Sequence, residues 1–121
     1  FALDAEASLP ATVRKPVDIA ADPAYQPDAE AERRGLILYA QRCGICHGFR
    51  AVAVGAAPDL RGSAIPRESA AFDVVVRQGA KVPGGMPQFG ELTERELADI
   101  RQYIRSEAVT AARRMAVPRQ A

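Results

Sequence analysis

Residues 43–47 read Cys43-Gly44-Ile45-Cys46-His47, two thiols three positions apart followed at once by an imidazole. They hold the only two cysteines and the only histidine of the 121 residues, so no thiol is left for a disulfide. Cysteines at this spacing can add across the two vinyl groups of a porphyrin and hold the next histidine beneath the iron. The motif predicts a covalently attached c-type haem, with Cys43 and Cys46 as anchors and His47 as an axial ligand.

Two other chemistries use a Cys-x-x-Cys pair. A structural zinc site needs four ligands, and the chain has no further thiol or imidazole to complete them. A thioredoxin-like dithiol lies between a buried strand and a helix. Residues 35–42 instead follow acidic, alanine-rich sequence and have the pattern of a helix. The sequence therefore favours haem attachment over both alternatives.

Length and composition indicate one compact domain, because 121 residues with 48% apolar content cannot hold two sizeable cores. The longest apolar runs, 36–40 and 51–57, are too short to cross a bilayer, so we expect no transmembrane segment. The net charge of +1 and the scattered basic residues argue against a nucleic-acid partner.

The beginning of the sequence bears on its origin. Phe1 is not an initiator methionine and no basic, apolar leader follows it, so we expect a processed chain or a piece of a longer one. In bacteria a c-type haem is attached after export. The motif therefore also predicts a periplasmic location.

Residues 1–27 differ from residues 28–121, for which we expect a cytochrome domain. Prolines at positions 10, 16, 23 and 27 interrupt every possible helix, which is typical of a linker. The alternative is an extended arm packed on the domain, and both descriptions can hold for different parts. The apolar residues available as anchors are Leu9, Val13, Val17, Ile19 and Tyr25.

The first two expected helices flank the stretch after the motif. Asp28 is a suitable N-cap for a helix that continues to about residue 42. A second helix is predicted over 69–78, with Gly79 supplying a left-handed C-terminal turn. Residues 48–63, rich in Gly, Ala and Pro, are expected to form loop.

The last helix has the strongest start signal. Thr93 and Glu96 form a capping box, and Leu92 and Leu97 occupy the hydrophobic staple positions around it. Apolar residues then recur at helical spacing to about Arg114. With few strand signals and no internal repeat, the sequence predicts an all-α fold.

The sixth iron ligand must come from another residue type, because the chain has no second histidine. The candidates are Met86, Met115, a lysine or an open position. Met86 lies in the Gly/Pro-rich loop 81–90, which can present its sulfur to the far face of a haem, and we expect it to be the sixth ligand. Met115 lies late in a helix among arginines, so we expect it to be exposed or packed. An open position would instead suit a peroxidase or gas-binding protein.

A short segment after the motif is expected to support the histidine. A ligating imidazole normally donates its other N–H to a carbonyl or carboxylate, and the Pro58 carbonyl is our candidate, with Asp59 as the acidic alternative. Leu60 would pack on the ring. Arg61 is either a partner for a haem propionate or an ordinary surface arginine.

These residues together resemble the class I cytochromes c from about residue 35 to 108. In that family a glycine and an aromatic residue on the first helix cross the last helix at an apolar residue and a tyrosine. Here the matching residues are Gly35 and Tyr39 against Ile100 and Tyr103. The resemblance implies three to five helices wrapped around one covalently bound haem, with an extended N-terminal arm.

More narrowly, the sequence resembles the C-terminal haem domain of quinohaemoprotein alcohol dehydrogenases. The matching runs are Cys-His-Gly, residues 58–63, 72–80 and 85–89. In that family a β-propeller carrying pyrroloquinoline quinone (PQQ) oxidises an alcohol and the cytochrome domain takes the electrons. The present sequence contains no propeller, quinone site or catalytic aspartate, so this chain alone is not expected to oxidise alcohols.

We therefore expect a monohaem electron-transfer domain. Its donor would be a dehydrogenase domain or subunit, with PQQ only in that partner. Its acceptor would be another cytochrome, a cupredoxin or a quinone-linked chain. A stand-alone periplasmic shuttle cytochrome and, from the enzyme class, a haem peroxidase or small-ligand sensor are the alternatives.

Overall fold

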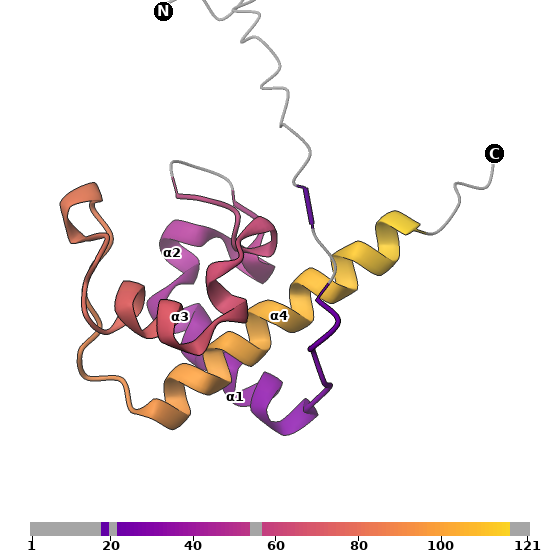
Figure 1. Cartoon of the computed structure of the whole chain (residues 1–121), viewed down its shortest axis with the longest axis horizontal. Helices are drawn as coiled ribbons and strands as arrows, with labels where there is room; N and C mark the ends of the chain where they lie inside the picture. The colour runs from indigo at the N-terminus through magenta and orange to yellow at the C-terminus, as the bar shows by residue number, and fades with distance from the viewer. Residues whose placement is uncertain (1–17, 20–21, 54–56, 117–121) are drawn as a thin grey trace, which may run out of the picture.

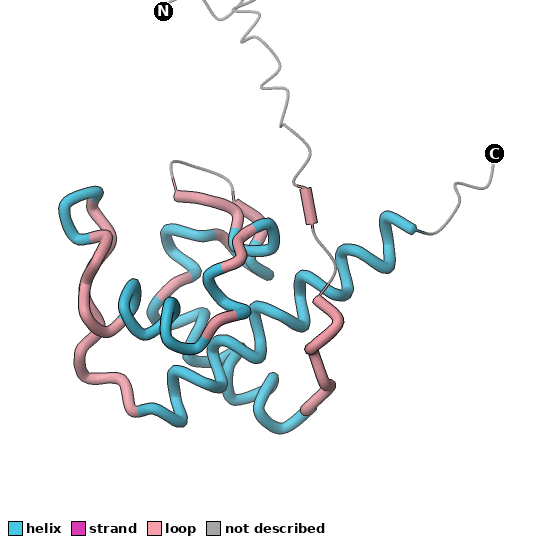
Figure 2. The backbone as a smooth tube through the Cα atoms, viewed as in Figure 1, coloured by secondary structure: helices cyan, strands magenta, loops and turns pink. Residues whose placement is uncertain are grey.

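The structure, a computed structural model, describes residues 18–19, 22–53 and 57–116. Within those ranges all regular structure is helical, as predicted, and no residue is assigned to a strand. The α-helices are α1 (Ala29–Arg42), α2 (Gly44–His47), α3 (Ser69–Val76) and α4 (Glu94–Ala116). Short 3-10 turns and loops connect them, and α1 crosses α4 while α2 and α3 lie to one side (Figures 1 and 2).

Helix α1 begins where the sequence predicted. The Asp28 side chain accepts a hydrogen bond from the Ala31 backbone N–H at 3.1 Å, which satisfies one of the unpaired donors of the first turn. Glu30 and Glu32 lie in the same turn, where a negative charge is stabilised by the helix dipole. The helix ends at Arg42, so the cofactor motif starts at its C-terminus.

Helix α4 has the predicted capping box. Thr93 N–H donates to the Glu96 carboxylate at 3.0 Å, and Glu96 N–H donates to the Thr93 hydroxyl at 3.1 Å. The staple residues Leu92 and Leu97 are both buried. The helix continues to Ala116, two residues further than expected.

Helix α3 is two residues shorter than predicted. It ends at Val76, and the Gln78 N–H already bonds to Asp73 O at 3.1 Å in a wider turn. Gly79 has φ 75° and provides the expected left-handed turn. Residues 48–63 also contain two 3-10 turns that periodicity did not indicate, η1 (Phe49–Ala51) and η2 (Leu60–Gly62).

The crossing of α1 and α4 depends on Gly35. A Cβ added there would lie 1.9 Å from the Asp99 carbonyl oxygen and 2.8 Å from Tyr103 Cβ, so only glycine allows this approach. Arg34, next to Gly35, donates two hydrogen bonds to the buried Asp99 carboxylate, at 2.8 and 3.1 Å. The predicted crossing of the two helices is therefore present, with an ion pair beside it.

The core lies along this crossing. The rings of Tyr39 and Tyr103 pack with their centroids 5.2 Å apart. Ile100 and Ile104, from the same face of α4, are fully buried. The cluster also includes Phe72 and Val76 of α3, Leu97 of α4, and Cys43, Ala51 and Leu92 from the segments between the longer helices.

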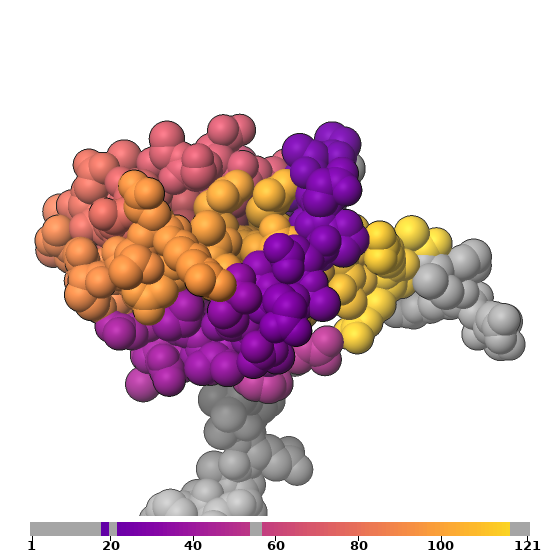
Figure 3. All heavy atoms as spheres, turned by 90° about the horizontal axis from the view of Figure 1, so that it is seen from below, coloured from indigo at the N-terminus to yellow at the C-terminus, as the bar shows by residue number. Residues whose placement is uncertain are grey.

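The described part of the N-terminal arm lies on α4. Figure 3 shows it, in indigo, across α4 and beside α1. Asp22 and Tyr25 both contact Arg105, through an ion pair of 2.7 Å and a ring contact of 5.8 Å. Of the expected apolar anchors, Ile19 and Tyr25 are half-buried, and the other three lie outside the described residues.

No helix among the described residues is both long enough and apolar enough to cross a membrane.

Replacing Gly35 by alanine should lower the free energy of unfolding by about 2 kcal/mol or more. The added methyl group collides with the backbone of Asp99, and this overpacking outweighs the gain of about 1 kcal/mol in helix propensity. Urea denaturation followed by circular dichroism measures the loss. Gly84→Ala is the matched control, since a Cβ there meets no atom within 4 Å. Equal stability of the two variants would contradict the tight crossing.

The contribution of Asp22 to stability should depend on pH. The hydrogen bonds from Arg105 hold the pKa of Asp22 below its ordinary value of 3.8, against the opposing effect of burial, and Arg67 lowers it further. A group with a lowered pKa in the folded state stabilises the protein above its unfolded pKa, and this contribution is lost as the pH falls. At neutral pH, Asp22→Asn should therefore cost about 1 to 2 kcal/mol.

That difference between Asp22→Asn and the unmodified chain should shrink as the pH is lowered from 5 toward about 3, as the Asp22 carboxylate of the unmodified chain becomes protonated. Urea denaturation over this range checks it. A difference that stays constant with pH would mean that the ion pair with Arg105 does not form in solution.

Candidate functional site

The motif occupies the junction of α1 and α2. Cys43 is the C-cap of α1, and its N–H bonds to Tyr39 O at 2.8 Å. The carbonyl of Cys43 then accepts from the N–H groups of Cys46 and His47, at 3.2 and 2.9 Å. This turn buries Cys43 and His47 and leaves Cys46 exposed, and the two cysteines are not joined by a disulfide.

Two residues hold the end of this turn. Gly48 has φ 89°, and a Cβ there would lie 1.8 Å from Val52 O, so the position requires glycine. Its carbonyl accepts a hydrogen bond of 2.7 Å from the Tyr39 hydroxyl, which is buried in the helix crossing. Sequence reasoning placed Tyr39 only at that crossing. A buried tyrosine hydroxyl usually needs a hydrogen-bond partner, and this rule could have predicted the second role of Tyr39.

The His47 ring is oriented by a backbone carbonyl. Its Nδ1 lies 3.0 Å from Pro58 O, the acceptor that the sequence suggested. With Nδ1–H donating to this carbonyl, the lone pair of Nε2 is left for a metal. His47 as a whole residue is 8% exposed, so it lies in the protein interior.

The acidic alternative, Asp59, is bound to another group. Its carboxylate accepts from Arg61 Nε at 3.0 Å and from Arg61 Nη2 at 2.8 Å, and it caps η2 by accepting from the Arg61 backbone N–H. Burial would raise the pKa of Asp59, but these hydrogen bonds outweigh it and hold the pKa below its ordinary value. Asp59 therefore fixes the Arg61 guanidinium beside the Pro58 segment.

Leu60 and Met86 both pack against the core cluster that contains Cys43. The turn before Met86 requires Gly85 at φ 102°, and the Met86 N–H bonds to Lys81 O at 3.2 Å. Phe89 N–H bonds to Val76 O at 2.8 Å and so fixes the far side of the loop to the end of α3. Met115, the other methionine, is 64% exposed, as expected.

The environment of the thiols bears on the alternatives. Burial raises the pKa of Cys43 to about 12, whereas a reactive redox dithiol has a lowered pKa. Among the described residues no group of three or more His, Cys, Asp or Glu side chains could hold a metal ion. An oriented imidazole, a thioether and two free thiols fit a haem instead.

Comparison with known proteins gives the same family. Residues 30–104 match the family described as cytochrome c oxidase, cbb3-type, subunit III. This match covers the motif and the helix crossing and ends inside α4, which continues for twelve more residues.

Two similar proteins are dehydrogenases. The chain is 39% identical, over 88% of its length, to the quinohemoprotein alcohol dehydrogenase ADH IIB of Pseudomonas putida, of which it spans 16%. It is 36% identical, over 86% of its length, to the dehydrogenase subunit of a quinone-type alcohol dehydrogenase of Gluconobacter oxydans, of which it spans 14%. The chain therefore corresponds to a small part of each relative.

The helix crossing, the histidine held by Pro58 and the family match agree on one assignment. A cytochrome of this family is an electron-transfer protein that binds haem c. The chain belongs to the cytochrome c family and has the all-α fold of a class I c-type cytochrome.

Proposed function

We propose that the chain binds its haem covalently and receives single electrons from a PQQ-dependent alcohol dehydrogenase domain of the same polypeptide, passing them to a downstream acceptor. The observation that carries the cofactor assignment is the contact of 3.0 Å between His47 Nδ1 and Pro58 O, next to two free cysteines. The similarity to quinone-type alcohol dehydrogenases supports the choice of donor. The chain spans only 14 to 16% of those proteins, and we assign the dehydrogenase domain to the part of them that it does not span.

The proposal gives each site residue a role. Cys43 and Cys46 would form the thioether links, and His47 and Met86 would hold the iron. When bound, the haem supplies one-electron chemistry, and ligation by histidine and methionine raises its reduction potential. With His47 and Met86 both bound to it, the iron would have no open position for a substrate, which distinguishes this function from that of a peroxidase.

The Pro58 segment would form one wall of the haem site. Leu60 would pack against the haem ring. The Pro58 carbonyl keeps the His47 imidazole in one tautomer. Arg61 uses Nε and one N–H of Nη2 to hold Asp59. A guanidinium has five N–H donors, so Arg61 keeps three with which to bind a haem propionate.

The acceptor would dock where the motif reaches the surface. Ile45, between the two cysteines, is 94% exposed, and Phe49 is 75% exposed. Exposed apolar side chains suit a small, transient interface with another cytochrome, a cupredoxin or a quinone-linked chain. Because c-type haem is attached after export in bacteria, we place this function in the periplasm.

An intact mass measured under denaturing conditions, on the protein isolated from its native source, tests cofactor and donor together. We expect a polypeptide several times the 13.0 kDa of this chain, carrying one haem that survives denaturation. Replacing both Cys43 and Cys46 by alanine should abolish the covalent adduct. A mass equal to this chain plus one haem would instead identify a stand-alone shuttle cytochrome, and a protein without haem would overturn the assignment.

Replacing Met86 by alanine should open the sixth position of the iron. The reduced variant should bind carbon monoxide rapidly, which the unmodified protein should not do, and its reduction potential should fall because the thioether is lost. Stopped-flow absorbance and a redox titration measure the two effects. Met115→Ala is the matched control, since that side chain is 64% exposed. Rapid carbon monoxide binding by the unmodified protein would favour a peroxidase or gas sensor.

A further inference from the structure

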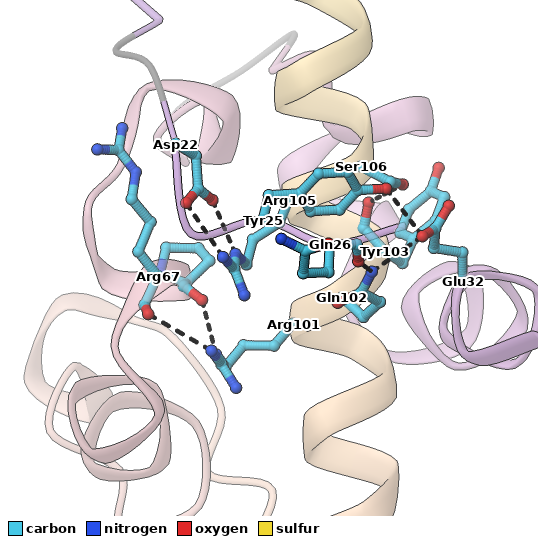
Figure 4. A network of polar contacts seen from close by, with 11 residues as sticks. Asp22, Tyr25, Gln26, Glu32, Arg67, Arg101, Gln102, Tyr103, Arg105 and Ser106 are labelled. Atoms are coloured by element: carbon cyan, nitrogen blue, oxygen red, sulfur yellow. Dashed lines mark hydrogen bonds and ion pairs between the residues drawn. The ribbon is translucent and has the colours of Figure 1, made fainter. Parts of the chain in front are cut away.

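A polar network away from the cofactor motif ties the segment 22–26 to α4 (Figure 4). Arg105 Nε donates to Asp22 Oδ2 at 2.7 Å, and Arg105 Nη2 donates to Asp22 Oδ1 at 3.0 Å. Both side chains are largely buried, 12% and 7% exposed. The Arg105 guanidinium carbon also lies 5.8 Å from the centre of the Tyr25 ring. One arginine of α4 therefore holds two residues of the arm, through a charge-assisted pair and a ring contact.

A second set of bonds joins the same segment to α1. The Glu32 carboxylate accepts from the Tyr25 hydroxyl at 2.8 Å and from Gln102 Nε2 at 2.9 Å. Gln102 Nε2 also donates to Gln26 O at 2.8 Å. The segment is thus bonded to both helices of the central crossing. We call this set the clamp, and its members are Asp22, Tyr25, Gln26, Glu32, Gln102 and Arg105.

The clamp lies beside the wall of the proposed haem site. A groove of about 310 Å³ is lined by Asp22 and Pro23 of the arm and by Leu60 and Arg61 of the wall segment. That wall segment begins at Pro58, which accepts the hydrogen bond from His47. The N-terminal arm therefore meets the cytochrome domain next to the Pro58 segment, which orients the proposed iron ligand.

We propose that the clamp positions the electron-donating domain relative to the haem, with Asp22 and Arg105 as positioning residues. This inference rests on the proposed function, in which the donor precedes this chain in the same polypeptide. A tether keeps two domains near each other, but it does not fix the distance between their redox centres, on which the rate of electron transfer depends steeply. The clamp holds residues 22–26, the end of this tether, against α4. It thereby fixes the side from which the donor reaches the cytochrome domain.

The test uses the full-length, haem-loaded protein. We compare the unmodified protein with Arg105→Gln and with the double variant Tyr25→Ala/Arg105→Gln. The matched control is Arg77→Gln, which breaks the pair of Arg77 with Asp73 on α3, 3.2 Å apart and outside the clamp. Stopped-flow absorbance follows haem reduction after mixing with alcohol. Alcohol oxidation with a dye as acceptor and the haem reduction potential are measured in parallel.

Haem reduction should be about tenfold slower in the clamp variants. A tenfold change corresponds to about 1.4 kcal/mol, the amount by which the variants would favour the positioned arrangement less. Their dye-linked activity and reduction potential should not change, and Arg77→Gln should behave like the unmodified protein. Hydrogen exchange at the Tyr25 amide, which bonds to Asp22 O at 3.2 Å, should rise in the clamp variants. No purely structural loss within the haem site would give this combination.

An unchanged rate of haem reduction in both clamp variants would overturn the inference. Unprotected exchange of the Tyr25 amide in the unmodified protein would also overturn it, because that amide bonds to Asp22 O only when the segment is held in this conformation. If alcohol fails to reduce the haem of the unmodified protein although dithionite does, the proposed donor is wrong. The inference then fails for that separate reason, whatever rate of hydrogen exchange is measured in the clamp.

Discussion

The close approach of α1 and α4 at Gly35 is the constraint on which the rest of the structure depends. Because no side chain separates the two backbones there, the rings of Tyr39 and Tyr103 can pack together one turn further along. Arg34 and Asp99 form their ion pair beside the same point. A glycine, an aromatic pair and an ion pair therefore fix the relative position of the two long helices. The loops and the short helices are built on that frame.

The cofactor motif is attached directly to this frame. Cys43 follows the last residue of α1, and the hydroxyl of Tyr39 reaches from the helix crossing to the carbonyl of Gly48, just after His47. The motif is thus held at both of its ends by the same tyrosine, through the backbone carbonyl of Tyr39 and through its hydroxyl. The Pro58 carbonyl then orients the histidine from the other side. The crossing thereby helps to hold His47, the proposed iron ligand, in one orientation, which suits one-electron transfer with little rearrangement.

Several elements could be predicted from sequence because their causes are local. The N-cap at Asp28, the capping box of Thr93 and Glu96, and the left-handed turn at Gly79 each depend on residues a few positions apart. Short 3-10 turns such as η2 gave no periodic signal and were not predicted. The end of α3 was placed two residues late, since helix ends depend on competing backbone bonds such as that from Gln78 to Asp73.

The sequence by itself determined the family and predicted the cofactor, because Cys43, Cys46 and His47 lie within five residues and no other cysteine or histidine competes with them. It also determined which residues could cross at Gly35. Only the tertiary structure decided between Pro58 and Asp59 as the partner of His47, and it did so by bonding Asp59 to Arg61. It alone joined Asp22 to Arg105, 83 positions apart, and Gln26 to Gln102, 76 positions apart. Contacts between such distant residues depend on how the helices pack, and no local pattern of residues encodes them.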